Sequence, residues 1–474
     1  MIKRVSISIA VLTVVVVMYS LFVKYPRLIS ANNTFDLDSI KKRGKLIALT
    51  DFNSTDYFIY KGEPMGFTYE LLSLFADHIG VPLEIITENN PDKAVELLKA
   101  GKADILATGL PINGVLTDVQ FCVPVDETRK VLVKRKNGVK PEKGPRYRNQ
   151  VREQTGLGKN TLYVQTGYTD YQSVLPVIQE LGDTVSILDV PYEPEKLIRL
   201  VAEGVIDYTI CDENLAIVNS TYYPGIDINT PAGPKEQVAW AVKSNSGNLF
   251  TELNNWISSY RNTADFALLY AEYFRNSRSG IIIKSNYYAI NTGRISGYDE
   301  IIRKYSAGSG WDWRLVASII CQESRFDPSV QSGAGAYGLM QIMPETAERY
   351  GIDITASPDS NIIAGMKYLN SLYKIFVKKI PDEKERVKFI LASYNAGPGH
   401  VLDAMKLAQK NGMDSSKWDG NVAFWLLKKS EREHYTDSVV SHGYFKGVES
   451  VHFVSQVIDR YNHYRNIVPE KWRR

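Results

Sequence analysis

ESRFDPSVQSGAGAYGLMQIMPETA, residues 323–347, and ASYNAGPG, residues 392–399, carry the strongest fold signal in this chain of 474 residues. Glycine recurs at positions 333, 335 and 338 in the first stretch, and it flanks the proline of the second. Because glycine has no Cβ, such positions allow tight turns and a close approach of the backbone to a ligand. The two stretches therefore indicate loops that are shaped around a bound molecule.

The segment before the first stretch is predicted to be an amphipathic helix. Val316, Ile319 and Glu323 follow helical spacing on one face, Asp312 is a suitable N-cap, and Pro328 is expected to stop the helix. This spacing places the carboxylate of Glu323 on the apolar face, where burial disfavours the charged form. We therefore expect a raised pKa and a proton that is held near neutral pH.

An ion-paired glutamate at the end of a helix is the alternative interpretation of Glu323 on its own, with Arg325 as the partner. The residues around it favour the catalytic interpretation. Gln341, Tyr394 and Asn395 supply donors and acceptors of the kind that orient the N-acetyl and hydroxyl groups of sugars. The ring of Tyr394 can also stack on a pyranose face.

The combination ES…GAYGLMQIMP…YNAGPG resembles the lysozyme-like soluble lytic transglycosylase (SLT) domain over residues 296–474. The resemblance implies a mainly α-helical fold in which Glu323 is the catalytic acid and base. It also implies a glycan cleft that is lined by Ser332, Met340, Gln341, Tyr394 and Asn395. Asp359 and Asn361 match a motif that we expect to be structural.

The reaction that this resemblance implies is cleavage of the β-1,4 bond between N-acetylmuramic acid (MurNAc) and N-acetylglucosamine (GlcNAc) in peptidoglycan. The C6 hydroxyl of the same sugar closes the ring and leaves a 1,6-anhydro-MurNAc end, so that no water, metal or other cofactor is required. One carboxylate then suffices. Asp327 is the nearest second candidate, but Pro328 disfavours helical geometry at Asp327, so we expect it in a turn or cap.

Two other functions stay open at this point. A hydrolytic muramidase would use water and would need a second acid near Glu323 in space. A non-catalytic sensor of the cell envelope would only hold glycan on the lysozyme-like fold.

An internal repeat organises the region before the helical domain. A helix end, a glycine and a new strand occur at residues 97–105 and again at 200–208, with a strand at 45–50 and a helix at 66–79 near the start. The distance in sequence between the two copies is typical of two α/β lobes. We expect these lobes to contain mostly parallel sheets and to have a ligand cleft between them.

Residues 36–275 resemble the periplasmic amino-acid-binding proteins, solute-binding protein family 3, through stretches such as GFTYELLSLFADHIGVPLEI and LLKAGKADILATGL. In that family an arginine after the GL strand grips the α-carboxylate of the ligand, but residues 109–117 of this chain contain none. Asp212 keeps the position of the family's amino-group acceptor, although a capped turn or a solvated loop would also explain it. We therefore expect a wall peptide or muropeptide as ligand, and regulation of the second domain through closure of the lobes. A spacer or a targeting module is the alternative role of this domain.

The remaining sequence concerns location. Lys3 and Arg4 precede an apolar run from Val5 to Val23, so residues 1–35 are predicted to be a signal peptide or a membrane anchor, with the rest on the periplasmic side of a bacterial envelope.

A balance of 56 basic and 53 acidic residues does not indicate a nucleic-acid partner. Three cysteines without metal-ligand spacing indicate neither a disulfide scaffold nor a zinc site. A linker is expected at 276–295, including a strand-like piece at 281–283.

Overall fold

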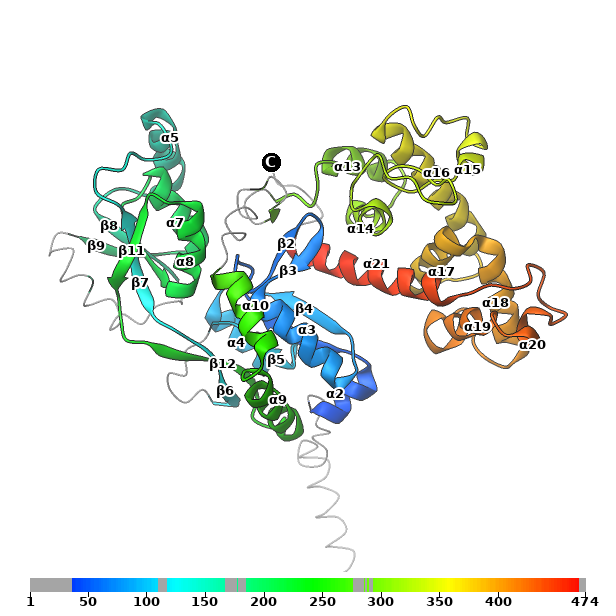
Figure 1. Ribbon diagram of the computed structural model, residues 1–474, viewed down its shortest axis with the longest axis horizontal. Helices are drawn as coiled ribbons and strands as arrows, with labels where there is room; N and C mark the ends of the chain where they lie inside the picture. The colour runs from blue at the N-terminus through cyan, green and yellow to red at the C-terminus, as the bar shows by residue number, and fades with distance from the viewer. Residues whose placement is uncertain are drawn as a thin grey trace, which may run out of the picture.

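A computed structural model describes residues 36–109, 117–166, 177, 185–275, 285, 288, 289 and 293–468 of the chain. The predicted amino-terminal segment and the strand-like piece at 281–283 lie outside the described residues. Within them, two α/β lobes are followed by a helical region, which lies at the right of Figure 1. None of the helices in this described part is long and apolar enough to cross a membrane.

The first lobe is built on a five-stranded sheet in the order β4-β1-β5-β12-β6, with a separate hairpin of β2 and β3. Its strands are β1 Leu46–Thr50, β2 Phe58–Tyr60, β3 Glu63–Met65, β4 Leu83–Thr87, β5 Ile105–Leu106, β6 Val119–Thr128 and β12 Glu236–Lys243, and its helices are α2 Leu37–Arg43, α3 Phe67–Ile79, α4 Pro91–Lys99, α9 Gly247–Tyr260 and α10 Ala264–Phe274. Helix α3 buries an apolar face that includes Leu71 and Phe75, and it ends at Gly80, whose φ of 74° is left-handed. The helix predicted here is confirmed.

The second lobe has its own five-stranded sheet in the order β11-β7-β10-β8-β9. Its elements are β7 Lys130–Arg135, α5 Pro145–Thr155, β8 Thr161–Gln165, β9 Ser186–Val190, α7 Pro194–Glu203, β10 Tyr208–Asp212, α8 Glu213–Tyr222 and β11 Ile226–Pro231. The repeated glycines adopt left-handed φ values of 69° at Gly101 and 80° at Gly204, and the strands after them, β5 and β10, belong to different sheets. The predicted two-lobe organisation is therefore confirmed.

The expectation of mostly parallel sheets was wrong. Each five-stranded sheet has two parallel and two antiparallel pairings. The reason is that β6 runs directly into β7, and β11 runs almost directly into β12, so that the chain crosses between the lobes without a helix to reverse it.

The third region is helical. Its elements are α13 Asp299–Ala307, α14 Trp313–Ser324, α15 Pro344–Glu348, α16 Pro358–Phe376, α17 Glu383–Ala396, α18 Pro398–Lys410, the short turn η2 Trp418–Val422, α19 Ala423–Lys428, α20 Arg432–Tyr435 and α21 Val448–Ile467. The α14 helix begins as predicted, because Asp312 accepts a hydrogen bond from the Arg314 backbone N–H. It ends three residues earlier than expected, since Arg325 and Phe326 have left-handed φ values of 51° and 64°. The chain therefore turns away well before Pro328.

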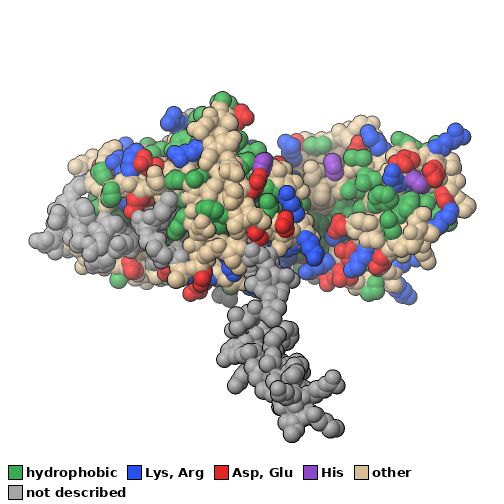
Figure 2. Space-filling model, turned by 90° about the horizontal axis from the view of Figure 1, so that it is seen from below, with side chains coloured by type: hydrophobic (Ala, Val, Ile, Leu, Met, Phe, Trp, Pro, Cys, Tyr) green, Lys and Arg blue, Asp and Glu red, His purple; other side chains and the backbone are tan. Residues whose placement is uncertain are grey.

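Helix α21 joins the helical region to the first lobe, and it lies between them in Figure 1. The Tyr464 hydroxyl donates a hydrogen bond of 2.7 Å to the Gly62 carbonyl, and the Tyr57 hydroxyl pairs with His463 Nδ1 at 2.7 Å. The side chain of Asn466 donates to the Ile85 carbonyl. One cluster of buried hydrophobic residues runs through the first lobe and the helical region, whereas most of the second lobe's core forms separate clusters. On the face shown in Figure 2, acidic and basic side chains are interspersed.

The tip of the β2–β3 hairpin presses against the end of α14. Gly62 has a φ of 81°, and a Cβ at this position would lie 2.6 Å from Phe326 Cε2, 2.7 Å from the Tyr464 hydroxyl and 2.9 Å from Cys321 Sγ. Only glycine meets both the backbone conformation and the space that is available.

We expect Gly62→Ala to destabilise the protein by about 1–3 kcal/mol more than Gly44→Ala, because overpacking of a well-filled site costs about that amount. Gly44 is a matched control, since its φ is 76° and a Cβ there would have open space within 4 Å. Denaturant unfolding of the two variants measures the difference. Equal losses of stability would contradict a tightly packed junction.

Candidate active site and first-lobe cavity

Glu323 lies in the last turn of α14, a helix whose residues from Trp313 to Cys321 are all buried. Burial raises the pKa of Glu323 to about 8. Within the described part of the chain, its carboxylate takes part in no hydrogen bond or ion pair, and Arg325 is exposed at the helix end. The predicted rise in pKa is confirmed, and the ion-paired alternative has no support. Such a carboxyl group can donate a proton at neutral pH.

The glycine-rich loop after α14 is held by its own side chains. Gln341 has a left-handed φ of 46°, and its side-chain amide donates to the carbonyls of Val330 and Gly338, both at 2.9 Å. The Ser332 hydroxyl accepts from the Ala336 N–H at 2.9 Å. Ser332 and Gln341 are half-buried and thus partly accessible. These contacts fix the loop before any substrate arrives.

Asn361 on α16 supports the same loop from behind, as expected for a structural residue. Its side chain accepts from the Met340 N–H at 2.8 Å and donates to the Tyr337 carbonyl at 2.7 Å. A Cβ at Gly338 would overlap the Asn361 amide, which explains the glycine. The side chain of Met340 is fully buried against Gly365. Met340 therefore contributes to the loop through its backbone hydrogen bonds, and its side chain is not available to a ligand.

Tyr394 and Asn395 lie at the end of α17. The Tyr394 hydroxyl donates to the Met340 carbonyl at 2.6 Å. Burial raises the pKa of Tyr394 well above its usual value, and the charge of Glu323 adds to the rise, so these two side chains are neighbours. The tyrosine ring lies near those of Tyr368 and Phe453 and is only 8% exposed. The expected stacking of this ring on a sugar is therefore not supported.

Asn395, in contrast, is exposed, and its side-chain oxygen accepts from the Ser450 hydroxyl at 2.6 Å. Asp327 lies in a turn, as predicted, where its carboxylate accepts from the Ser329 N–H at 2.8 Å. It is exposed, and it does not contribute to the pKa of Glu323. The other acidic residue predicted to be structural, Asp359, accepts from the Tyr305 hydroxyl at 3.0 Å.

A polar link between the first lobe and α14 was missed in the sequence. Glu63 in the hairpin pairs with Arg460 on α21 through both carboxylate oxygens at 3.2 Å. Arg460 also donates to the side chain of Gln322 at 2.9 Å, and Gln322 directly precedes Glu323. No spacing pattern could have found a pair that is separated by 397 positions.

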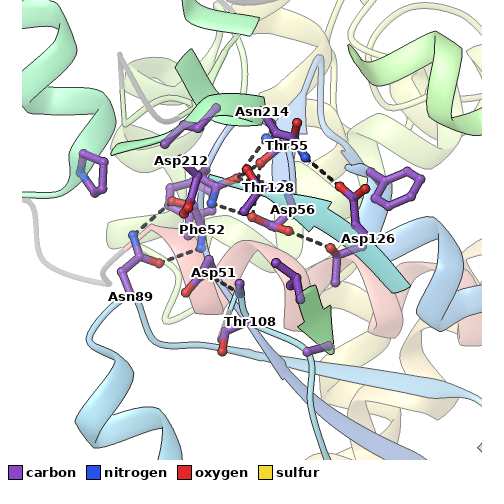
Figure 3. Close-up of a pocket in the computed structure, with 18 of the residues that line it drawn as sticks. Asp51, Phe52, Thr55, Asp56, Asn89, Thr108, Asp126, Thr128, Asp212 and Asn214 are labelled. Atoms are coloured by element: carbon purple, nitrogen blue, oxygen red, sulfur yellow. Dashed lines mark hydrogen bonds between the residues drawn. The ribbon is translucent and has the colours of Figure 1, made fainter. Parts of the chain in front are cut away.

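A cavity lies between the two α/β lobes, where the sequence predicted a ligand cleft (Figure 3). Asp212 lines it at the end of β10 and forms an ion pair of 2.7 Å with Lys130. It therefore faces the cleft while also being neutralised. The segment 110–116, where the family's arginine would be expected, lies outside the described residues. Five further carboxylates that the sequence analysis did not single out also line the cavity: Asp51, Asp56, Asp126, Glu193 and Glu195.

No group of three or more His, Cys, Asp or Glu side chains in the described residues is arranged to hold a metal ion. The three cysteines, Cys122, Cys211 and Cys321, are buried free thiols.

Two family models match the chain. Residues 46–276 match the bacterial extracellular solute-binding proteins, family 3, and residues 300–416 match the transglycosylase SLT domain. A solved structure of a mutant of ArgBP from T. maritima is 21% identical, covers 51% of this chain and 99% of its own, and has a TM-score of 0.41.

Curated relatives match nearly the whole chain. The membrane-bound lytic murein transglycosylase F of Desulfosudis oleivorans is 33% identical over 427 residues, which cover 89% of this chain and 90% of that protein. The protein of the same name from Pseudomonas fluorescens is 29% identical over 432 residues, with 89% and 85% covered. This chain therefore belongs to the membrane-bound lytic murein transglycosylase F family.

Proposed function

We propose that this protein is a lytic transglycosylase that cuts the MurNAc–GlcNAc β-1,4 bond of peptidoglycan and leaves 1,6-anhydro-MurNAc ends. The observation that carries the proposal is the half-buried side chain of Glu323, whose carboxyl group has a pKa that desolvation raises to about 8 and has no charged partner among the described residues. Membership of the family and the match to the transglycosylase SLT domain support the same reaction class.

The reaction needs a single side chain that first gives and then takes a proton. Glu323 donates its proton to the glycosidic oxygen as the bond from that oxygen to C1 of MurNAc breaks, and the N-acetyl group of the sugar helps to stabilise the positive charge at C1. The ionised Glu323 then removes the proton of the C6 hydroxyl, whose oxygen bonds to C1. Because nucleophile and electrophile belong to one sugar, the ring closure gains the advantage of an intramolecular reaction.

The residues that line the glycan cleft would hold the sugar in place while Glu323 gives and takes the proton. We assign Ser332, Gln341 and Asn395 to direct contacts with the glycan, because their side chains are accessible. Met340 and Tyr394 are assigned to the shape of the cleft, since the hydrogen bond between them ties the loop to α17 beside Glu323.

Hydrolysis by a muramidase is less well supported. Hydrolytic glycosidases usually use two carboxylates that flank the bond. Among the described residues, burial alone accounts for the raised pKa of Glu323, so no second carboxylate acts on it. A non-catalytic sensor of the cell envelope would not need a glutamate with a raised pKa at position 323.

We propose that residues 1–35 bring the protein to the membrane, that residues 36–275 and 296–474 work on the periplasmic side, and that 276–295 link them. The name of the relatives, membrane-bound, supports association with the envelope. The apolar run from Val5 to Val23 supports an anchor or a signal peptide.

We also propose that the first domain regulates the second by binding a wall peptide or muropeptide. The link from Glu63 through Arg460 to Gln322 supports this role, because it joins the first lobe to the residue beside the catalytic acid. Coupling of this kind acts equally in both directions, as a ligand that changes glycan affinity must have its own affinity changed by glycan.

Replacement of Glu323 by glutamine should lower turnover at least about a hundredfold, because the amide keeps the size of the side chain but cannot donate the proton. Mass spectrometry of the products from purified peptidoglycan measures the anhydro ends, which are one water lighter than hydrolysed ends. The matched control is Asp327→Asn, which removes an exposed carboxylate four residues away and should retain activity. Near-normal formation of anhydro product by the Glu323→Gln variant would exclude the single-acid mechanism.

The rate should fall as the pH rises through about 8, since the first step needs the protonated form of Glu323 and its pKa is raised to about 8 by burial. Above that pH we expect kcat/KM to fall about tenfold per pH unit. Initial rates from mildly acidic to alkaline pH give the profile, and circular dichroism at each pH checks that the fold is intact. A flat profile with chemistry rate-limiting argues against a proton donor of raised pKa.

Coupling between the domains is tested by calorimetry on the full chain. A disaccharide-tetrapeptide should bind with an affinity that changes when a tetramer of N-acetylglucosamine occupies the glycan cleft, and the tetramer's affinity should change by the same factor. In Glu63→Ala, the mutual effect should shrink, whereas in Glu127→Ala it should persist, because Glu127 forms only an exposed ion pair with Lys235. Tight binding of the peptide that is indifferent to the tetramer would make the first domain a passive binder.

A further inference from the structure

The cavity between the lobes is lined by an unusual excess of acidic side chains. Six carboxylates line it, and no Lys, Arg or His is among the described residues of its lining: Asp51, Asp56, Asp126, Glu193, Glu195 and Asp212. They come from both lobes, since Asp51 follows β1 and Asp126 lies on β6, whereas Asp212 ends β10 and Glu193 precedes α7.

Among the described residues, five of the six carboxyl groups form no ion pair. Asp212 has Lys130 at 2.7 Å, whereas Asp126 accepts from the neutral amide of Asn214 at 2.6 Å, a contact between the two lobes. Burial, and then the charge of Asp56, raise the pKa of Asp51 well above its usual value. Carboxylates that repel one another in a partly dry site favour a positively charged ligand, which relieves the repulsion.

Two hydroxyl groups in the same cavity are buried without a partner in the described part of the chain. Thr108, just after β5, is 5% exposed, and Thr128, at the end of β6, is 8% exposed, and neither side-chain oxygen has a hydrogen-bond partner there. Both residues line the cavity (Figure 3). An unsatisfied buried hydroxyl costs about 1–3 kcal/mol, so these two groups indicate a site that is completed by a polar ligand.

The other residues that line the cavity indicate which class of ligand it fits. Phe52, Phe67, Trp240 and Phe274 line the cavity together with the carboxylates. Aromatic faces attract organic cations, above all when water is excluded. The rings and the acidic side chains together favour an organic cation, and no group of three or more His, Cys, Asp or Glu side chains in the described residues is arranged to hold a metal ion.

We propose that the cavity binds an organic cation that carries at least two protonated amino or guanidino groups, bridged between carboxylates of the two lobes. The α-carboxylate of an ordinary amino acid would find no positive side chain among the described lining residues and would lie among six acidic side chains. A free diamine and a peptide amide with two free amino groups offer this chemistry without a carboxylate, whereas a basic amino acid offers the two positive groups but also brings its α-carboxylate among the acidic side chains. This proposal rests on the binding role of the first domain given above, but not on the glycan reaction or on its regulation.

Calorimetry of the full chain tests the proposal with three cationic probes: 1,5-diaminopentane, L-arginine and an alanyl-lysyl peptide amide. Each has a matched control with fewer positive charges: 1,5-pentanediol and the fully acetylated peptide carry none, and L-citrulline keeps its α-ammonium but lacks the guanidinium charge of arginine. We expect at least one cationic probe to bind, with its control at least about a hundredfold weaker, and the tightest probe identifies the source of the cation. Affinity should also fall as salt is added, because charges are being paired.

Three variants locate the binding. Asp51→Asn removes one carboxyl group that would ionise and pair with a bound cation, so it should weaken the cation at least about tenfold. Asp77→Asn removes an exposed carboxyl group on α3 in the same lobe and should have no effect. Thr128→Val keeps the shape of the side chain and removes its unpartnered hydroxyl, so it should weaken binding severalfold while the protein remains at least as stable. This variant keeps the test decisive if Asp51→Asn fails to fold.

The proposal is overturned if none of the cationic probes binds, or if their binding is indifferent to both Asp51→Asn and Thr128→Val. Binding of the acetylated peptide as tightly as the free one would also overturn it, while leaving the first domain a binding domain for another class of ligand. Formation of anhydro product from peptidoglycan is measured separately, so that its failure concerns Glu323 and not this cavity.

Discussion

The close contact of the β2–β3 hairpin with α14 and α21 is the constraint on which the arrangement of the two domains depends. Gly62 lies where a side chain would meet Phe326, Tyr464 and Cys321. Through this contact the first lobe and the helical region share one hydrophobic cluster. The first lobe is thereby part of the packing that positions α14, the helix that carries Glu323.

The raised pKa of Glu323 follows from this packing. A carboxylic acid stays protonated at neutral pH only where water is scarce and no cation lies beside it, and both conditions are met at the end of a helix that is buried along most of its length. Neighbouring backbone groups are satisfied by other side chains, as Asn361 does for the Met340 N–H and Tyr394 for the Met340 carbonyl. The acid is therefore surrounded by groups that are already paired and do not compete for its proton.

Features set by neighbours in sequence could be predicted, and features set by distant neighbours could not. The spacing from Asp312 to Glu323 was sufficient for the helix and for its buried carboxylate, and the repeated glycines were sufficient for two lobes. The end of α14 was misplaced because Arg325 and Phe326 adopt left-handed conformations, which are uncommon for such residues. The acidic cavity was missed because its carboxylates come from four separate parts of the chain: the loop after β1, strand β6, the start of α7 and the end of β10. Only the fold brings these parts together.

The two lobes differ in how firmly they are attached to the catalytic region, and this difference decides how a ligand can act. The first lobe shares its core with the helices, whereas most of the second lobe's core is separate, and β6–β7 and β11–β12 join the lobes. Asp126 and Thr128 lie on β6, and Lys130, which pairs with Asp212, begins β7. A ligand that bridged the lobes, as proposed above, would act on the strands that connect them. Because the first lobe contacts the helical region at Gly62 and Glu63, a shift of this lobe would be felt by α14 and α21, whose side chains Gln322 and Arg460 form one hydrogen-bonded chain with Glu63.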